Sequence, residues 1–78
     1  MKVRVAYSII KEVEIEVDDK FEGAAIYDTT TAEEEDIAYG LIKELRKIAK
    51  EEVMRLNPNN FVGVEGLSTE DGYTIWES

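Results

Sequence analysis

The chain has 78 residues with no histidine and no cysteine, and its 18 acidic residues outnumber its 9 basic residues to give a net charge of −9. This length fits one domain, residues 1–78, with a modest core. The missing residue types remove the commonest general base, the best nucleophile and any thiolate metal site, so we expect neither an enzyme nor a cofactor. The acidic balance argues against direct binding of nucleic acid or of anionic membranes.

The first residues lack the features of an export signal, because Met1 runs directly into alternating apolar and polar residues. No apolar run approaches the roughly 20 residues that a membrane span needs. We therefore expect a cytoplasmic protein that does not contact a membrane.

Residues 2–17 alternate with a period of two, which is typical of β-strands. One strand of this length would extend for about 50 Å, too long for the domain, so we predict a hairpin with a three-residue loop at residues 9–11. This register predicts five opposite pairs: Tyr7 and Val13, Val5 and Ile15, Val3 and Val17, Arg4 and Glu16, and Lys2 and Asp18. The loop lacks Gly, Asn and Asp, so one strand bent by a bulge is the alternative.

A connection over residues 18–30, with Phe21 against the core edge, leads to a helix that we predict over residues 32–56. Thr31 and Glu34 form a capping box at its start. An apolar stripe with helical spacing, expected to face the core, runs from Ile37 to Leu56. The other side carries basic residues, namely Lys43, Arg46, Lys47 and Lys50. Asn57 and Pro58 are expected to end the helix.

The C-terminal residues predict a second hairpin, with strands at residues 61–67 and 73–77 and a turn at Asp71-Gly72. This turn sets two pairs opposite each other: Leu67 and Trp76, and Thr69 and Thr74. We expect Trp76 to pack in the core.

The fold class is therefore α+β, in the order β-β-α-β-β, with one amphipathic helix packed on a four-stranded, mostly antiparallel sheet. This element order resembles that of β-grasp domains. The opening, which ends in residues 13–21 (VEIEVDDKF), resembles short uncharacterised acidic proteins of Gram-positive bacteria and their phages. The second resemblance covers about a quarter of the chain and implies an accessory or mobile-element protein.

Eleven acidic residues and one lysine lie between Glu12 and Asp36, and this block is the main candidate for a functional surface. We expect it to imitate nucleic-acid phosphates and to bind a larger basic protein. The candidate contacts are Glu12, Glu14, Glu16, Asp18 and Asp19 from the strand, and Glu33, Glu34, Glu35 and Asp36 from the helix start. The simpler interpretation is that the strand acids form the solvent face of a sheet and the helix acids complement the helix dipole.

Three apolar residues are further candidates for partner contacts. Ile9 and Ile10 fall at the predicted hairpin tip, where they could insert into a pocket of a partner, unless the predicted turn is wrong and they belong to the core. Tyr39 lies on the helix flank and could anchor an interface, although scattered exposed apolar residues are common.

These features together predict a small protein-binding module. The most specific form of this prediction is an inhibitor from a phage or mobile element, of the anti-CRISPR or other anti-defence type. Such an inhibitor would block a nucleic-acid-binding groove by charge mimicry. The alternative is a self-associating structural or regulatory module, such as a homodimer joined through a sheet edge.

Overall fold

The structure is a computed structural model that describes residues 1–8, 11–26, 29–56 and 63–78. Its elements are β1 (Lys2–Ser8), β2 (Lys11–Glu16), the 3-10 helix η1 (Asp19–Ala24), α1 (Ala32–Leu56), β3 (Gly66–Thr69) and β4 (Thr74–Glu77). The predicted α+β class and the order β-β-α-β-β are confirmed, and η1 lies in the predicted connection.

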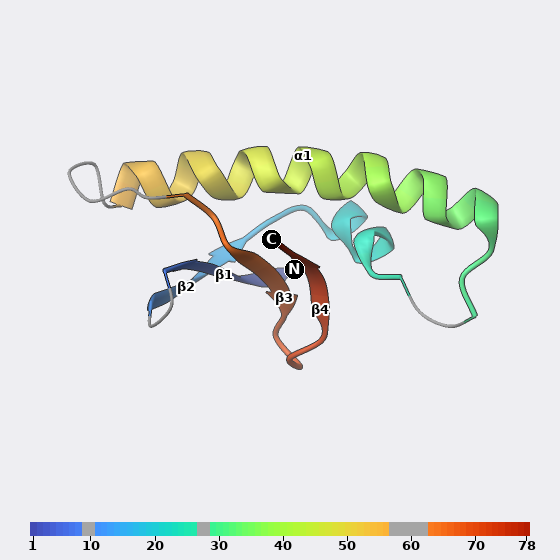
Figure 1. The fold of residues 1–78 in the computed structure, drawn as a ribbon, viewed down its shortest axis with the longest axis horizontal. Coiled ribbons are helices and arrows are strands. Elements are labelled where there is room, and N and C mark those ends of the chain that lie inside the picture. The colour runs from blue at the N-terminus through green and yellow to red at the C-terminus, as the bar shows by residue number, and fades with distance from the viewer. Residues whose placement is uncertain (9–10, 27–28, 57–62) are drawn as a thin grey trace.

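The four strands form one sheet in the order β2-β1-β3-β4, and every neighbouring pair is antiparallel. The helix α1 crosses one face of this sheet, and no described element covers the other face (Figure 1). Strand β1 lies beside β3, which makes β2 and β4 the two edges. The resemblance to β-grasp domains is one of element order.

The first hairpin is present, but its register differs from the predicted one by two residues. Val5 lies opposite Val13, and Arg4 lies opposite Glu14. A shift of two residues keeps every side chain on the same face of the sheet. The alternation of apolar and charged residues therefore identifies the faces but cannot distinguish these two registers.

A bulge in β1 accounts for one residue of this two-residue difference, and the pairing of Ser8 with Lys11 accounts for the other. The pairing is irregular between Ala6 and Ser8, so Tyr7 is an extra residue in β1, and Ser8 pairs with Lys11. An extra residue in one strand shifts all pairs beyond it by one position. The predicted tip residues, Ile9 and Ile10, lie outside the described residues.

The second hairpin is present, and β3 begins at Gly66 and ends at Thr69, two residues later than predicted. Residues 63–65 are not part of this strand, and residues 61 and 62 lie outside the described residues. Gly72 has a φ of +87°, and its backbone N–H donates to the carbonyl oxygen of Thr69 at 2.9 Å. This geometry is typical of a three-residue hairpin loop with glycine in the left-handed region. The predicted pairing of Thr69 with Thr74 is wrong, since Thr74 lies opposite Ser68.

A second bulge lies in β4 and brings two side chains to the helix side of the sheet. Leu67 lies opposite Trp76, as predicted, and the next pair joins Ser68 to Thr74, which leaves Ile75 as the extra residue. Ile75 is buried in the core, and Trp76 packs against the core while half-buried. The bulge therefore places an indole ring near α1 at the edge of the sheet.

The start of α1 has the predicted capping box. The backbone N–H of Glu34 donates to Thr31 Oγ1 at 3.2 Å. The backbone N–H and the hydroxyl of Thr31 both donate to Glu34 Oε1, at 3.3 and 2.9 Å. These bonds satisfy backbone donors that the first turn leaves without helical partners. The bounds of α1 agree with the predicted helix, while Asn57 and Pro58 lie outside the described residues.

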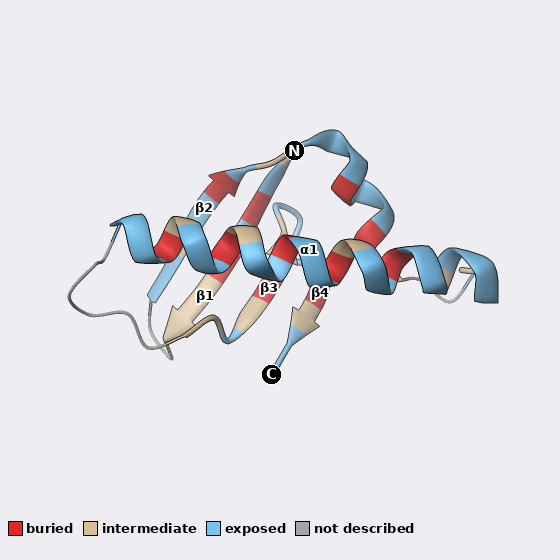
Figure 2. Ribbon diagram, turned by 90° about the horizontal axis from the view of Figure 1, so that it is seen from above, coloured by how far each residue is buried: buried red, intermediate tan, exposed pale blue. Residues whose placement is uncertain are grey.

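The core lies between α1 and the sheet, with η1 closing one side (Figure 2). Its buried residues are Val3, Val5, Ile15, Phe21, Ala24, Ile42, Leu45, Ala49, Val53, Leu67 and Ile75. Ile37 and Leu56 were expected to face this core but are 64% and 46% exposed. The 25 residues of α1 span about 37 Å, which carries both ends of the helix beyond the sheet.

Gly40 is exposed in the interior of α1, and a Cβ atom added there would meet nothing within 4 Å. We expect Gly40→Ala to raise the free energy of unfolding by about 0.5–1 kcal/mol, because alanine is the better helix former. Gly72→Ala is the contrasting variant and should destabilise, since its φ is positive. Urea unfolding measures both changes, and a lower midpoint for Gly40→Ala would contradict the expectation.

Candidate functional site

Three glutamates form a row along β2: Glu12, Glu14 and Glu16, named here the acidic row. All three are exposed, while Val13 and Ile15 between them pack toward the core on the helix side. Successive side chains of a strand point to opposite faces, so the acidic row projects from the face that α1 leaves uncovered. Residues on one face of a strand are about 6.5–7 Å apart. Because β2 is an edge strand, the row lies at the rim of the molecule.

The two ends of the acidic row differ in their electrostatic surroundings. Glu16 lies opposite Lys2, and its Oε1 lies 3.0 Å from the N-terminal ammonium group. Glu14 lies opposite Arg4, and Glu12 has an uncharged residue opposite it. Among the described residues, neither Glu12 nor Glu14 forms an ion pair. Glu12 and Glu14 are therefore the two members of the row that no ion pair among the described residues holds.

Asp18 and Asp19 stabilise the turn that follows β2. Asp18 Oδ1 accepts the backbone N–H of Lys20 at 2.9 Å and caps η1. Asp19 Oδ1 accepts a hydrogen bond from the N-terminal ammonium group at 2.9 Å. This bond to Asp19, followed by the bond to Glu16, raises the pKa of the ammonium group above its usual value of 8.0. Both aspartates thus have structural roles.

The raised pKa of the N-terminal ammonium group predicts a pH dependence of stability. A group whose pKa is higher in the folded state stabilises fully below its unfolded pKa, about 8, and loses that contribution as the pH rises through the folded pKa. The thermal midpoint should therefore fall more between about pH 7 and pH 10 in the parent protein than in Asp19→Asn. Calorimetry at a series of pH values measures this, and equal falls would contradict it.

The acids of the helix start lie far from the acidic row. Figures 1 and 2 show α1 beginning at the opposite end of the molecule from β2. These residues are Glu33, Glu34, Glu35 and Asp36. Glu34 belongs to the capping box, and Glu33, Glu34 and Glu35 lie in the first turn, where acidic residues complement the helix dipole. The structure therefore does not join the two sets of predicted contacts into one surface.

Of the predicted apolar contacts, the structure describes only Tyr39. It is 58% exposed on α1, next to the helix-start acids and far from the acidic row. Ile37, one of the misassigned core residues, is exposed two positions earlier.

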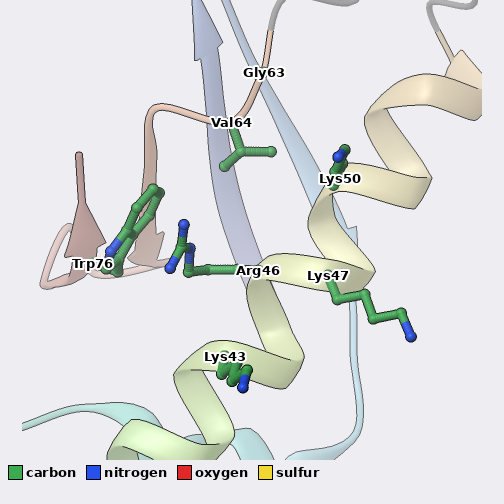
Figure 3. A pocket seen from close by; sticks show the side chains of 7 residues that line it. All are labelled: Lys43, Arg46, Lys47, Lys50, Gly63, Val64 and Trp76. Atoms are coloured by element: carbon green, nitrogen blue, oxygen red, sulfur yellow. The ribbon is translucent and has the colours of Figure 1, made fainter.

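A basic groove lies on the helix side of the sheet and was not predicted. It encloses about 560 Å³ and is lined by Lys43, Arg46, Lys47, Lys50, Gly63, Val64 and Trp76 (Figure 3). The guanidinium carbon of Arg46 lies 4.1 Å from the centroid of the Trp76 ring, a cation–π contact. The basic spacing i, i+3, i+4, i+7 is visible in the sequence, but the contact between residues 46 and 76 depends on the tertiary fold.

The described residues contain no group of three or more acids arranged to hold a metal ion. They also contain no helix with the length and apolar character that crossing a bilayer requires. Comparisons with protein-family models, curated proteins and solved structures gave no match.

Proposed function

We propose that this chain is a small protein-binding module whose acidic row occupies a basic, nucleic-acid-binding groove on a larger protein. The observation that carries the proposal is the position of the row on an edge strand and on the uncovered face of the sheet. A partner can approach such a rim without displacing any described element. The glutamates form a regular line of negative charges, as the phosphates of a nucleic-acid strand do.

Association would be guided by charge. Complementary potentials at the rim of an interface raise the association rate more than they slow dissociation.

The specific form that we propose is an inhibitor of a bacterial defence effector, of the anti-CRISPR type, encoded by a phage or another mobile element. The N-terminal resemblance to short acidic proteins of Gram-positive bacteria and their phages supports this setting.

A homodimer is the second candidate, because β4 is also an unpaired edge. Pairing β2 with its counterpart in another copy would place glutamates beside glutamates, which opposes association. A dimer would therefore form through β4, whose four residues offer a short pairing surface. Mass measured over a range of protein concentrations distinguishes this candidate from a monomeric inhibitor.

The proposal can be tested by using the protein as bait in a Gram-positive bacterial lysate, with and without nuclease, at low and high salt. We expect it to retain a basic nucleic-acid-binding protein whose recovery falls as salt rises and falls when nucleic acid is added. Retention that is indifferent to salt would contradict charge mimicry. No retained protein together with a stable dimer mass would favour the second candidate.

Two matched double variants test whether a captured protein binds through the acidic row. Glu12→Gln with Glu14→Gln removes two negative charges from the row, at the two positions that form no ion pair with a described residue. Glu33→Gln with Asp36→Asn removes two negative charges from the helix start and leaves the capping residue Glu34 in place. Only the first pair should reduce capture.

A further inference from the structure

The basic groove concentrates positive charge in an otherwise acidic chain. Four of the nine basic residues line it, spaced three and four positions apart along α1: Lys43, Arg46, Lys47 and Lys50. Like charges at these spacings repel one another and oppose helix formation. None of the four forms an ion pair within the part of the chain that the structure describes. A bound anion would relieve this repulsion.

The contact with Trp76 orients the Arg46 side chain within the groove. Figure 3 shows its side chain extending from α1 to the Trp76 ring, where the guanidinium group stacks. A stacked guanidinium still presents N–H groups at its edge, in the fork that pairs with phosphate or carboxylate oxygens. Lys43 and Lys50 lie about one helical turn before and after Arg46, while Lys47 points away from Trp76. The groove thus combines one oriented cation with flexible ones.

The charge of the remaining surface limits the size of the anion. Since the net charge of −9 includes these four cations, the rest of the chain carries −13. A long polyanion such as nucleic acid would extend from the groove over repelling surface. A compact ligand avoids this, and about 560 Å³ falls within the usual range for small-molecule sites. Val64 and Trp76 supply an apolar wall for an organic portion.

We propose that the basic groove binds a compact organic polyphosphate of the nucleoside diphosphate or triphosphate class. The phosphoryl groups bind Lys43, Arg46 and Lys50, and the base lies against Val64 and the indole of Trp76. This site is separate from the acidic row, which projects from the opposite face of the sheet, so either proposal can fail without the other.

Trp76 provides the readout, because it is the only tryptophan in the chain. Its fluorescence, excited at the red edge of its absorption, would be followed during titration with ATP without added metal. Inorganic tripolyphosphate, a pentaglutamate peptide and a short single-stranded oligonucleotide are the comparison ligands. Amide chemical shifts of the same samples locate the site. We expect saturable binding of ATP with a Kd below about 1 mM, and weaker binding of each comparison ligand.

Two matched double variants distinguish ATP binding in the groove from a general effect of net charge on ATP binding. Lys43→Gln with Lys50→Gln should weaken ATP binding about tenfold or more, corresponding to the loss of two phosphate contacts. Lys2→Gln with Lys11→Gln makes the same change in net charge at exposed positions of the sheet, outside the groove, and should change the Kd by no more than about twofold.

The remaining outcomes would overturn the proposal. Absence of saturable ATP binding up to about 1 mM excludes a nucleotide site of useful affinity. Tighter binding of pentaglutamate would assign the groove to an acidic peptide, and tighter binding of the oligonucleotide would assign it to nucleic acid. Equal affinities for tripolyphosphate and ATP would show that the apolar wall does not contact the ligand. Equal weakening by both variant pairs would indicate a nonspecific charge effect.

Discussion

Phe21→Ala is expected to lower the free energy of unfolding by about 3–5 kcal/mol, because deleting a buried aromatic side chain loses its transfer free energy and leaves a cavity. Phe21 is 1% exposed and projects from η1 into the core that α1 covers. At about 0.05–0.15 kcal/mol per residue, a domain of 78 residues has a total stability of about 4–12 kcal/mol. The variant should therefore lose a large fraction of the stability of the domain, and at the lower end of this range it should be largely unfolded under ordinary conditions.

Urea unfolding followed by far-ultraviolet circular dichroism measures this loss. Phe21→Leu is the control, since it keeps the site apolar and much of its volume, and should cost less than half as much as alanine. A loss below about 1 kcal/mol for Phe21→Ala would contradict the position of η1, because losses that small are typical of substitutions at the surface and not in the core.

Glu12→Gln with Glu14→Gln is expected to slow association with the captured partner about tenfold or more at low salt, with a smaller change in the dissociation rate. The physical reason is that rim charges act mainly through steering, whose contribution to association spans about 10–1000-fold. Glutamine preserves the size of each side chain and leaves the backbone of β2 unchanged. Surface-based binding kinetics at several salt concentrations measure both rates.

Glu33→Gln with Asp36→Asn is the matched control for this prediction, because it changes the net charge by the same amount at the other end of the molecule. Its association rate should remain within about twofold of the parent rate, since exposed charges more than a Debye length away are largely screened. Equal slowing by the two variant pairs would mean that overall charge, and not the acidic row, guides association.

The helix could be predicted from the sequence because its signals are local. Thr31 and Glu34 are three residues apart, and the bonds between them form whenever that segment becomes helical. The exposure of Ile37 and Leu56 could not be predicted this way. It depends on how far the four-stranded sheet extends beneath α1, and this extent is less than the length of the helix.

For the strands, the sequence pattern predicted the faces but not the pairing register. Alternation correctly identified which residues of β1 and β2 face the core, but it could not predict the bulge at Tyr7, which contributes one residue of the difference in register. A bulge has no strong sequence signal when the extra residue is itself a strand former. The same holds for Ile75, whose insertion in β4 changed the partner of Thr74.

The candidate surfaces were predictable only in part. The row of Glu12, Glu14 and Glu16 follows from alternation alone, but its distance from the helix-start acids follows from the tertiary fold. The basic groove was missed because Arg46 and Trp76 meet only when β4 lies at the sheet edge beneath α1. In the sequence, the four basic residues resemble an ordinary solvated helix face.

Competition between this protein and nucleic acid for the captured partner would show whether the two occupy the same groove. A fluorescent oligonucleotide bound to the partner would be titrated with the parent protein and with Glu12→Gln/Glu14→Gln. We expect complete displacement by the parent protein and a loss of potency of about tenfold or more in the variant. Formation of a stable complex that contains partner, oligonucleotide and this protein together would contradict it.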